Sequence, residues 1–315
     1  MRRRLMEVVL LGLLGLVAVL VVQVGLPYWR RTEPSIPEGP EGSCAREVTA
    51  AVYIENRRRL SEASAWASYY GSGGLEELAR FDLVDLDADP GLQGAYSEED
   101  ICSLESQGVL VVSYLNLGTI EDFRRYEPQL RAYSLAEYED WPGEYWLDVT
   151  QPQVQDYLVE NVARSLASRG VDGFYLDNLD LVLRYPTDQV REGILRLVER
   201  LRGAFPNHLI IAQNGLSLMY EPLEGGREFW ELLDGVAVEE TYWRYTGGGY
   251  QPAGQRVTRA TERQLGRLLE RHLPIFTLDY TLARDEAVAV AERSRDQGFV
   301  PYVADVELQT IHFLP

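Results

Sequence analysis

The fold is decided by the stretch VDGFYLDNLD at residues 171–180. Its first half is an apolar run rich in β-favouring residues, and Asp177, Asn178 and Asp180 follow in its second half. Apolar residues spaced by four occur between 154 and 166, and a second pattern of helical period spans 190–201. A short buried strand between two helices is the repeating unit of an α/β protein with a parallel sheet.

Further apolar runs share this design, because they end in Gly, Asn, Asp or Glu and alternate with helical patterns. Eight strand–helix units in about 250 residues predict a closed (β/α)8 TIM barrel, with a doubly wound sheet as the alternative. The segment 145–148 also resembles a strand, and we interpret it as part of a long loop above the barrel, from Gly118 to Thr150. The predicted strands are Trp66–Tyr70, Leu83–Asp87, Val109–Leu115, Gly173–Asp177, Leu209–Asn214, Gly235–Glu240, Ile275–Tyr280 and Val300–Asp305.

The N-terminal residues have the pattern of a targeting segment. Arg2, Arg3 and Arg4 precede the apolar run Val8–Leu26, which is long enough to cross a bilayer. We therefore expect a signal anchor or signal peptide at residues 1–31, which contacts a membrane and leaves the rest of the chain extracytoplasmic, anchored or secreted. Residues 32–63, with several Pro and Gly, are interpreted as a linker and lead-in, and residues 64–315 as the barrel.

The composition excludes several classes of function. Asp and Glu number 49 against 30 basic residues, all of them Arg, and the net charge of −19 argues against a nucleic-acid partner. Two cysteines and three histidines are too few for a zinc module or a disulfide scaffold, and no metal or cofactor is predicted. Outside the cytosol, Cys44 and Cys102 could form a disulfide, and two unpaired thiols are the alternative.

Polar residues collect where the predicted strands end. In a TIM barrel these ends surround the active site. Acids, amides and aromatic rings suit a sugar there, because aromatic faces stack on C–H surfaces while polar groups bind hydroxyls. A single Asp or Asn at such a turn could instead cap the following helix. The candidate substrate-binding residues are Tyr69, Tyr70, Asp87, Tyr114, Asn116, Asp148, Asn178, Asp180, Asn214, Glu240, Tyr242, Trp243, Asp279 and Tyr280.

A series of segments occurs in a characteristic order: WASYYG (66–71), SYLNLG (113–118), WLDVT (146–150), VDGFYLDNLD (171–180), AQNG (212–215), VEET (238–241) and GFVPYV (298–303). Over about residues 64–310 this series resembles glycoside hydrolase family 114, the endo-α-1,4-polygalactosaminidase-like group of TIM barrels. The resemblance implies an endo-acting glycosidase that cleaves α-1,4-linked galactosamine-containing polysaccharide. The family's catalytic Asp after the fourth strand matches Asp177, and its Glu after the sixth matches Glu239, with Glu240 as the neighbouring alternative.

The chemistry of glycoside hydrolysis accounts for such a pair. One carboxyl must be protonated to assist the leaving oxygen, and the other must be ionised to act on the anomeric carbon directly or through water. Glu239 follows the apolar residues Val236–Val238, so we expect desolvation to raise its pKa and make it the acid. Asp177, beside Asn178, is expected to stay ionised as the nucleophile or base. A non-catalytic carbohydrate-binding barrel is the alternative function, but the presence of both carboxylates favours catalysis.

Overall fold

The structure is a computed structural model that describes residues 47–139 and 141–314. Its centre is an eight-stranded sheet whose neighbouring strands run parallel and follow one another in chain order. Each predicted strand is present, with ends shifted by at most one residue. The strands are β1 (Trp66–Tyr69), β2 (Leu83–Leu86), β3 (Leu110–Asn116), β7 (Gly173–Asp177), β8 (Leu209–Gln213), β9 (Gly235–Glu239), β12 (Ile275–Tyr280) and β13 (Val300–Ala304).

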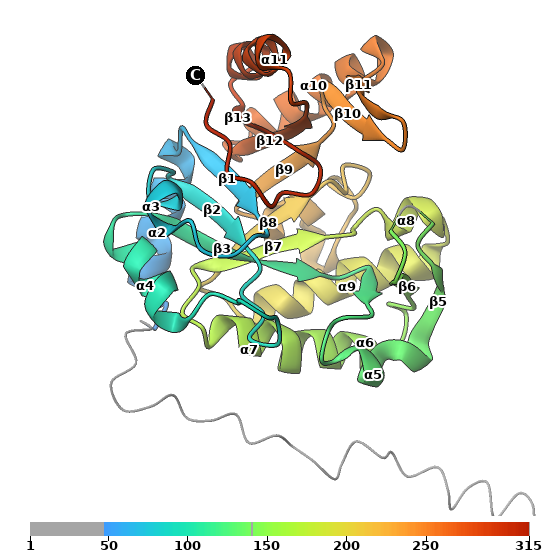
Figure 1. Cartoon of the computed structure of the whole chain (residues 1–315). Helices are drawn as coiled ribbons and strands as arrows, with labels where there is room; N and C mark the ends of the chain where they lie inside the picture. The colour runs from blue at the N-terminus through green and yellow to red at the C-terminus, as the bar shows by residue number, and fades with distance from the viewer. Residues whose placement is uncertain (1–46, 140, 315) are drawn as a thin grey trace, which may run out of the picture. The chain divides into compact units, whose positions relative to one another are not determined.

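The sheet curls into a near-closed barrel, as predicted, and the doubly wound alternative is wrong (Figure 1). The first and last strands are joined by Trp66, whose Nε1 donates a hydrogen bond to the backbone carbonyl of Val300 (3.0 Å). Inside the barrel, the Trp66 ring packs against the rings of Tyr175, Phe276 and Tyr302, with centroids 6.2, 5.5 and 6.0 Å away. The interior is therefore a packed core and not a pore.

Helices cover the outside of the barrel (Figure 1). In α9 (Asp188–Ala204) the apolar residues of the 190–201 pattern are buried, and Thr187 caps the first turn by accepting a hydrogen bond from the Val190 amide (3.3 Å). The 154–166 pattern is also helical, running through α6 (Pro152–Tyr157), a π-helical turn at 158–163 and α7 (Arg164–Ala167). The remaining outer helices are α3 (Leu75–Leu78), α4 (Glu98–Ser106), α5 (Glu127–Leu130), α8 (Leu181–Arg184), α10 (Gln255–Leu269) and α11 (Arg284–Asp296).

Two small antiparallel sheets are inserted between barrel strands. The first follows β3 and consists of β4 (Thr119–Glu121), β6 (Glu144–Leu147) and β5 (Ser134–Glu137), in that spatial order. The strand-like segment in the predicted long loop therefore lies outside the barrel, as expected, but the loop forms a sheet of its own. The second is the hairpin of β10 (Trp243–Thr246) and β11 (Gly249–Pro252), which follows β9.

A helix that the sequence analysis did not predict packs against the N-terminal ends of the barrel strands. This helix, α2 (Ala50–Glu62), lies in the region interpreted as linker and lead-in. Asn56 donates a hydrogen bond to Asp172 (2.6 Å), and the Tyr53 hydroxyl donates one to Asp234 (2.7 Å). These two acids directly precede β7 and β9. Because polar contacts fix α2, apolar periodicity gave no indication of it.

Some predictions concern residues outside the described part of the chain. The predicted signal anchor or signal peptide at residues 1–31 is one of them. Cys44, one half of the possible disulfide, is another, whereas Cys102 lies in α4. Among the residues that are described, no helix is both long and apolar enough to span a membrane.

The contact between α2 and the barrel generates a prediction about stability. Replacing Asn56 by Ala removes the amide that donates to Asp172, a fully buried acid that also accepts a hydrogen bond from the Val111 amide (3.0 Å). We expect Asn56→Ala to lower the free energy of unfolding by about 1–3 kcal/mol, because a buried carboxylate loses a partner. Urea denaturation measures the change. The exposed neighbour Glu55, changed to Ala, is the control, and an equal loss there would contradict the prediction.

Candidate active site

Three neighbouring barrel strands end in the same unusual backbone turn. The residue after each strand is left-handed: Asn178 follows β7 (φ 57°), Asn214 follows β8 (φ 57°) and Glu240 follows β9 (φ 56°). Asn tolerates this conformation better than most residues, whereas Glu rarely adopts it. The backbone amide of Glu240 donates a hydrogen bond to the carbonyl of Leu278 on β12 (2.8 Å), so the backbone hydrogen bonds between β9 and β12 continue into the turn. These turns hold the last residue of each strand at the carboxyl end of the barrel.

Asp177, the last residue of β7, is enclosed by polar donors. Its Oδ2 accepts a hydrogen bond from the Tyr114 hydroxyl (3.0 Å), and its Oδ1 accepts one from the Asn178 amide (2.6 Å). Burial raises the pKa of Asp177 well above its ordinary value, and the charge of Glu239 raises it further. The donors from Asn178 and Tyr114 act in the opposite direction but do not compensate for the loss of water.

Glu239, the last residue of β9, is held by donors from both adjacent strands. The Tyr280 hydroxyl donates to its Oε1, and Asn214 Nδ2 donates to its Oε2 (3.1 Å). Asn214 in turn accepts a hydrogen bond from the Glu239 backbone amide through Oδ1 (3.1 Å). Glu240 lies differently, because its Oε1 accepts from the Tyr245 amide (3.0 Å) in the β10–β11 hairpin. Of the Glu239–Glu240 doublet, Glu239 is therefore the residue beside Asp177.

The structure changes the expected electrostatics of the pair. We expected Asp177 to stay ionised because its neighbours are polar, yet burial and the nearby Glu239 raise its pKa. These polar neighbours pack around Asp177 at the mouth of the barrel, the region where the carboxyl ends of the barrel strands meet, and leave the side chain only partly exposed to water. Asp177 therefore holds its proton more tightly than a solvent-exposed aspartate does.

The sequence analysis missed a third carboxyl of the mouth, Glu144. It lies on β6, outside the barrel, and its Oε1 accepts hydrogen bonds from Asn116 Nδ2 (3.2 Å), Asn178 Nδ2 (3.1 Å) and the Thr119 hydroxyl. Burial raises the pKa of Glu144, and its charge contributes to the raised pKa of Asp177. The alternation in EYWL at 144–147, with Glu144 two residues from buried Trp146, is the sequence signal that could have identified it.

A further acid, Asp85, lies deeper in the barrel. It is fully buried on β2, and its Oδ2 accepts hydrogen bonds from the Tyr70 hydroxyl (2.6 Å) and the Ser68 hydroxyl (2.8 Å). Burial raises its pKa well above the ordinary value. The Tyr70 ring also contacts that of Tyr114 edge-on, with centroids 5.2 Å apart. Asp85 therefore fixes two rings of the mouth through Tyr70.

Most of the predicted mouth residues converge on the carboxyl pair. Asn116 Nδ2 donates to the Tyr114 hydroxyl (3.0 Å), which itself donates to Asp177. Asp180 accepts a hydrogen bond from the Gly215 amide (3.3 Å), and burial together with the charge of Glu239 raises its pKa. The predicted residues that the structure brings together are Tyr70, Tyr114, Asn116, Asp177, Asn178, Asp180, Asn214, Glu239 and Tyr280.

Two predicted residues face away from the barrel interior. Successive residues of a strand point to opposite sides, so Tyr69 and Asp279 are out of phase with Tyr70 and Tyr280. The Tyr69 hydroxyl donates to the Ser72 carbonyl (3.2 Å) in the turn after β1. For these residues the sequence analysis identified the correct strand end but the wrong face.

Asp279 positions a loop. Its Oδ1 accepts hydrogen bonds from the backbone amides of Tyr242 (2.6 Å) and Trp243 (2.8 Å). Burial raises the pKa of Asp279 to about 7. The Tyr242 side chain is buried against Val290 and Val303, on the outer side of the barrel. Trp243 is half-buried at the start of β10. The structure thus places the side chains of Asp279 and Tyr242 on the outer side of the barrel, and their role as substrate contacts stays a prediction.

Asp87 and Asp148 have structural partners. Asp87 forms an ion pair with the buried Arg124 (2.8 Å), which also pairs with Asp89 (3.3 Å) and Glu121 (2.9 Å). Asp148 accepts hydrogen bonds from the Thr150 amide (3.2 Å) and from Gln151 Nε2 (2.8 Å) just before α6. Neither acid caps a helix: Asp87 binds Arg124, and Asp148 holds the turn that precedes α6.

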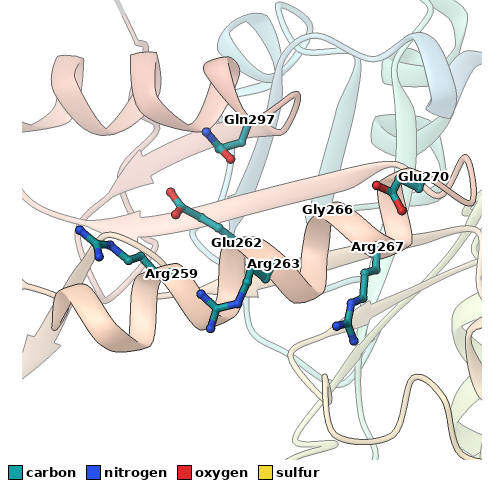
Figure 2. Close-up of a pocket in the computed structure, with 7 residues that line it drawn as sticks. All are labelled: Arg259, Glu262, Arg263, Gly266, Arg267, Glu270 and Gln297. Carbon is teal, nitrogen blue, oxygen red and sulfur yellow. The ribbon is translucent and has the colours of Figure 1, made fainter.

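A hollow of about 420 Å³ lies elsewhere, on the outside of the barrel between α10 and the end of α11 (Figure 2). Figure 2 shows Arg259, Arg263 and Arg267 extending from α10, while Gln297 approaches Glu262 from the neighbouring helix. None of the predicted site residues lines this hollow. Within the described ranges, no group of three or more His, Cys, Asp or Glu is placed to hold a metal ion.

The raised pKa of Asp177 generates a prediction about pH and stability. An acid whose pKa is higher in the folded protein than in the unfolded chain ionises more easily when the chain unfolds. Such an acid therefore lowers the free energy of unfolding as the pH rises from about 4 to the pKa of the folded state. We expect Asp177→Asn to raise the free energy of unfolding at pH 7 and to have little effect below about pH 3, where the carboxyl is mostly protonated in both the folded and the unfolded state. Denaturation at several pH values measures this. The exposed Asp122→Asn should show no such pH-dependent gain, and a loss of stability for Asp177→Asn at pH 7 would refute the prediction.

Comparison with known proteins identifies the family of this chain. The family model of glycoside-hydrolase family GH114 matches residues 49–314. An uncharacterised protein of Deinococcus radiodurans is 27% identical over 219 residues, and the match covers 65% of this chain and 67% of that protein. An uncharacterised protein of Thermotoga maritima is 25% identical over 256 residues, and the match covers 74% of this chain and 77% of that protein.

Two solved structures have a similar fold. The glycoside hydrolase domain of PelA from Pseudomonas aeruginosa has a TM-score of 0.69 at 24% identity, covering 80% of this chain and 98% of that domain. Aspergillus fumigatus Ega3, in complex with galactosamine, has a TM-score of 0.61 at 16% identity, covering 78% of this chain and 92% of Ega3. With nearly the whole described barrel matched by the family model, the chain belongs to glycoside-hydrolase family GH114 and is a glycoside hydrolase.

Proposed function

We propose that this glycoside hydrolase is an endo-acting enzyme that cleaves an α-1,4-linked, galactosamine-containing polysaccharide, with Asp177 and Glu239 as its catalytic pair. The observation that supports the pair is its position at the ends of β7 and β9, where the charge of Glu239 acts on a buried Asp177. Glycoside hydrolysis requires one carboxyl that acts as an acid and a second that acts on the anomeric carbon, and the ends of β7 and β9 supply two such groups.

In the proposed mechanism, Asp177 is the nucleophile or base and Glu239 the acid. The Tyr114 hydroxyl and the Asn178 amide support the ionised form of Asp177 while it acts on the anomeric carbon. In the proposed reaction, Glu239 acts in its protonated form and delivers its proton to the leaving oxygen. Tyr280 and Asn214 fix the Glu239 carboxyl in place for that transfer.

The charge of the mouth supports an amino-sugar substrate. Among the described residues, no Arg or His forms an ion pair with Asp177, Glu239 or Glu144. Since buried carboxylates without a counter-charge are costly, a cationic ligand would be attracted to this mouth. The similarly folded Ega3 was solved with galactosamine, a sugar that carries such an amine.

We also propose that the enzyme acts outside the cytoplasm, tethered to a membrane or secreted through residues 1–31. The support is the sequence pattern of three arginines followed by the apolar run Val8–Leu26. Cell fractionation tests this placement, since activity confined to the cytosol would contradict it.

The proposed pair predicts the behaviour of four variants. We expect Asp177→Asn and Glu239→Gln each to lower turnover at least about a hundredfold, because each keeps its shape and loses its proton chemistry. Glu240→Gln should have a smaller effect, since Glu240 contacts the β10–β11 hairpin. Release of reducing ends from a panel of amino-sugar and neutral polysaccharides measures turnover, and the exposed Glu137→Gln serves as the control.

The roles within the pair can be separated with an activated aryl glycoside, whose leaving group needs no proton. Glu239→Gln should retain activity on it and Asp177→Asn should not. The reverse result would exchange the two roles, and full activity of both variants on polysaccharide would exclude the pair. Binding of sugar without any turnover by the unmodified chain would favour the non-catalytic carbohydrate-binding barrel.

The charge of the mouth also predicts a substrate preference. We expect a partly deacetylated, cationic amino-sugar polymer to be cleaved faster than a uronic-acid polymer, because the field of the acids attracts one and repels the other. The preference should weaken as the salt concentration rises above about 0.15 M, where the screening length is about 8 Å. Initial rates on both polymers across a salt series measure it. Equal rates on cationic and neutral amino-sugar oligomers, independent of salt, would show that the acids do not select the substrate.

A further inference from the structure

Glu144 and Glu121 lie directly opposite each other on the antiparallel strands β6 and β4. Opposite residues of such a pair project from the same face of the sheet, and two like charges there destabilise it unless something neutralises them. Each charge also affects the mouth, since Glu144 and Glu121 both contribute to the raised pKa of Tyr114. The two glutamates therefore face the catalytic end of the barrel from a sheet that is not part of it.

Each of the two glutamates has one oxygen without a protein partner. The Glu121 side chain is 9% exposed; its Oε1 binds Arg124 (2.9 Å), whereas its buried Oε2 has no hydrogen-bond partner. Glu144 is half-buried, its Oε1 receives all three of its donors, and no hydrogen bond or ion pair within the described residues reaches its Oε2. A buried oxygen without a partner, such as Glu121 Oε2, is rare and indicates a missing partner. Glu144 Oε2 is not among the fully buried oxygens, so a ligand can reach it.

The available positive charge does not balance these acids. Arg124 is shared among Asp87, Asp89 and Glu121, and the three donors of Glu144 are neutral amides and a hydroxyl. A neutral ligand group could donate to these oxygens but would leave the charge uncompensated. A small cation with several N–H donors would supply both the charge and the hydrogen bonds.

We infer that Glu144 and Glu121 form a subsite for the ammonium group of an amino sugar, adjacent to the catalytic pair. The subsite rests on the proposed function, and it explains how a barrel enzyme could distinguish a free amine from an acetamide. Asn116 and Asn178 connect the two places, because both donate to Glu144 and Asn178 also borders Asp177. A sugar whose ring is held at Asp177 would thus have its amine, or that of the adjoining residue, within reach of the glutamates.

Binding measurements test the subsite separately from catalysis. The full chain carrying Glu239→Gln, which prevents turnover, is titrated with galactosamine oligomers and with fully N-acetylated oligomers of equal length. Addition of Glu144→Gln should lower the ratio of the two affinities, cationic over acetylated, at least about tenfold. The preference should also vanish when the pH exceeds the pKa of the sugar amine. Glu137→Gln, from β5 of the same sheet, is the control and should leave the ratio unchanged.

The outcomes separate this inference from the proposed function. If Glu144→Gln weakens both ligands equally, Glu144 only positions Asn116 and Asn178, and the ammonium subsite is refuted. An unchanged ratio with unchanged affinities refutes it as well. Failure of the unmodified chain to release reducing ends would instead contradict the proposed function, whatever the binding ratio shows. Because Glu144→Gln retains the size and the acceptor oxygen of the side chain, circular dichroism should confirm an intact fold in each variant.

Discussion

Every side chain on the barrel strands has one of two environments, because successive residues of a strand face opposite sides of the sheet. On β12, Phe276 and Tyr280 face the interior, where they contact Trp66 and Glu239, while Asp279 supports the loop outside. The same alternation on β7 directs Tyr175 and Asp177 inward and places Phe174 against Phe205, at the end of α9. The aromatic core and the acidic mouth are thus formed by inward-facing residues of the same strands, with the acids closer to the carboxyl ends.

Acids at the two ends of the barrel differ in whether an arginine neutralises them. At the N-terminal end, Asp234 accepts hydrogen bonds from Tyr53 (2.7 Å) and the Ile210 amide (2.9 Å) and pairs with Arg57 (3.0 Å) and Arg202 (2.6 Å). These contacts compensate for burial, so the acid ties α2 and α9 to the strands. Such a carboxylate has a structural role.

At the carboxyl end, the three acids closest to the proposed reaction lack that compensation. Asp177, Glu239 and Glu144 receive hydrogen bonds from neutral hydroxyls and amides, and burial raises the pKa of Asp177 and of Glu144. Buried, uncompensated acids destabilise a protein, and they are also the groups whose protons can move at moderate pH. The same burial that lowers the stability of this end of the barrel also raises the pKa of its acids, which suits them to acid–base chemistry on a sugar.

The sequence by itself determined the barrel, because eight β-favouring runs alternate with helical periods and this pattern depends only on neighbouring residues. It also indicated Asp177 at the end of the fourth strand and the doublet Glu239–Glu240 at the end of the sixth, and the structure ends that strand at Glu239. Tertiary structure alone decided the rest. The position of Glu144 depends on the pairing of β6 with β4, two strands that do not belong to the barrel. The proton affinity of Asp177 depends on how much water its neighbours exclude, and α2 is held by polar contacts to residues more than a hundred positions away. Burial and long-range pairing are properties of the folded chain, so no local pattern encodes them.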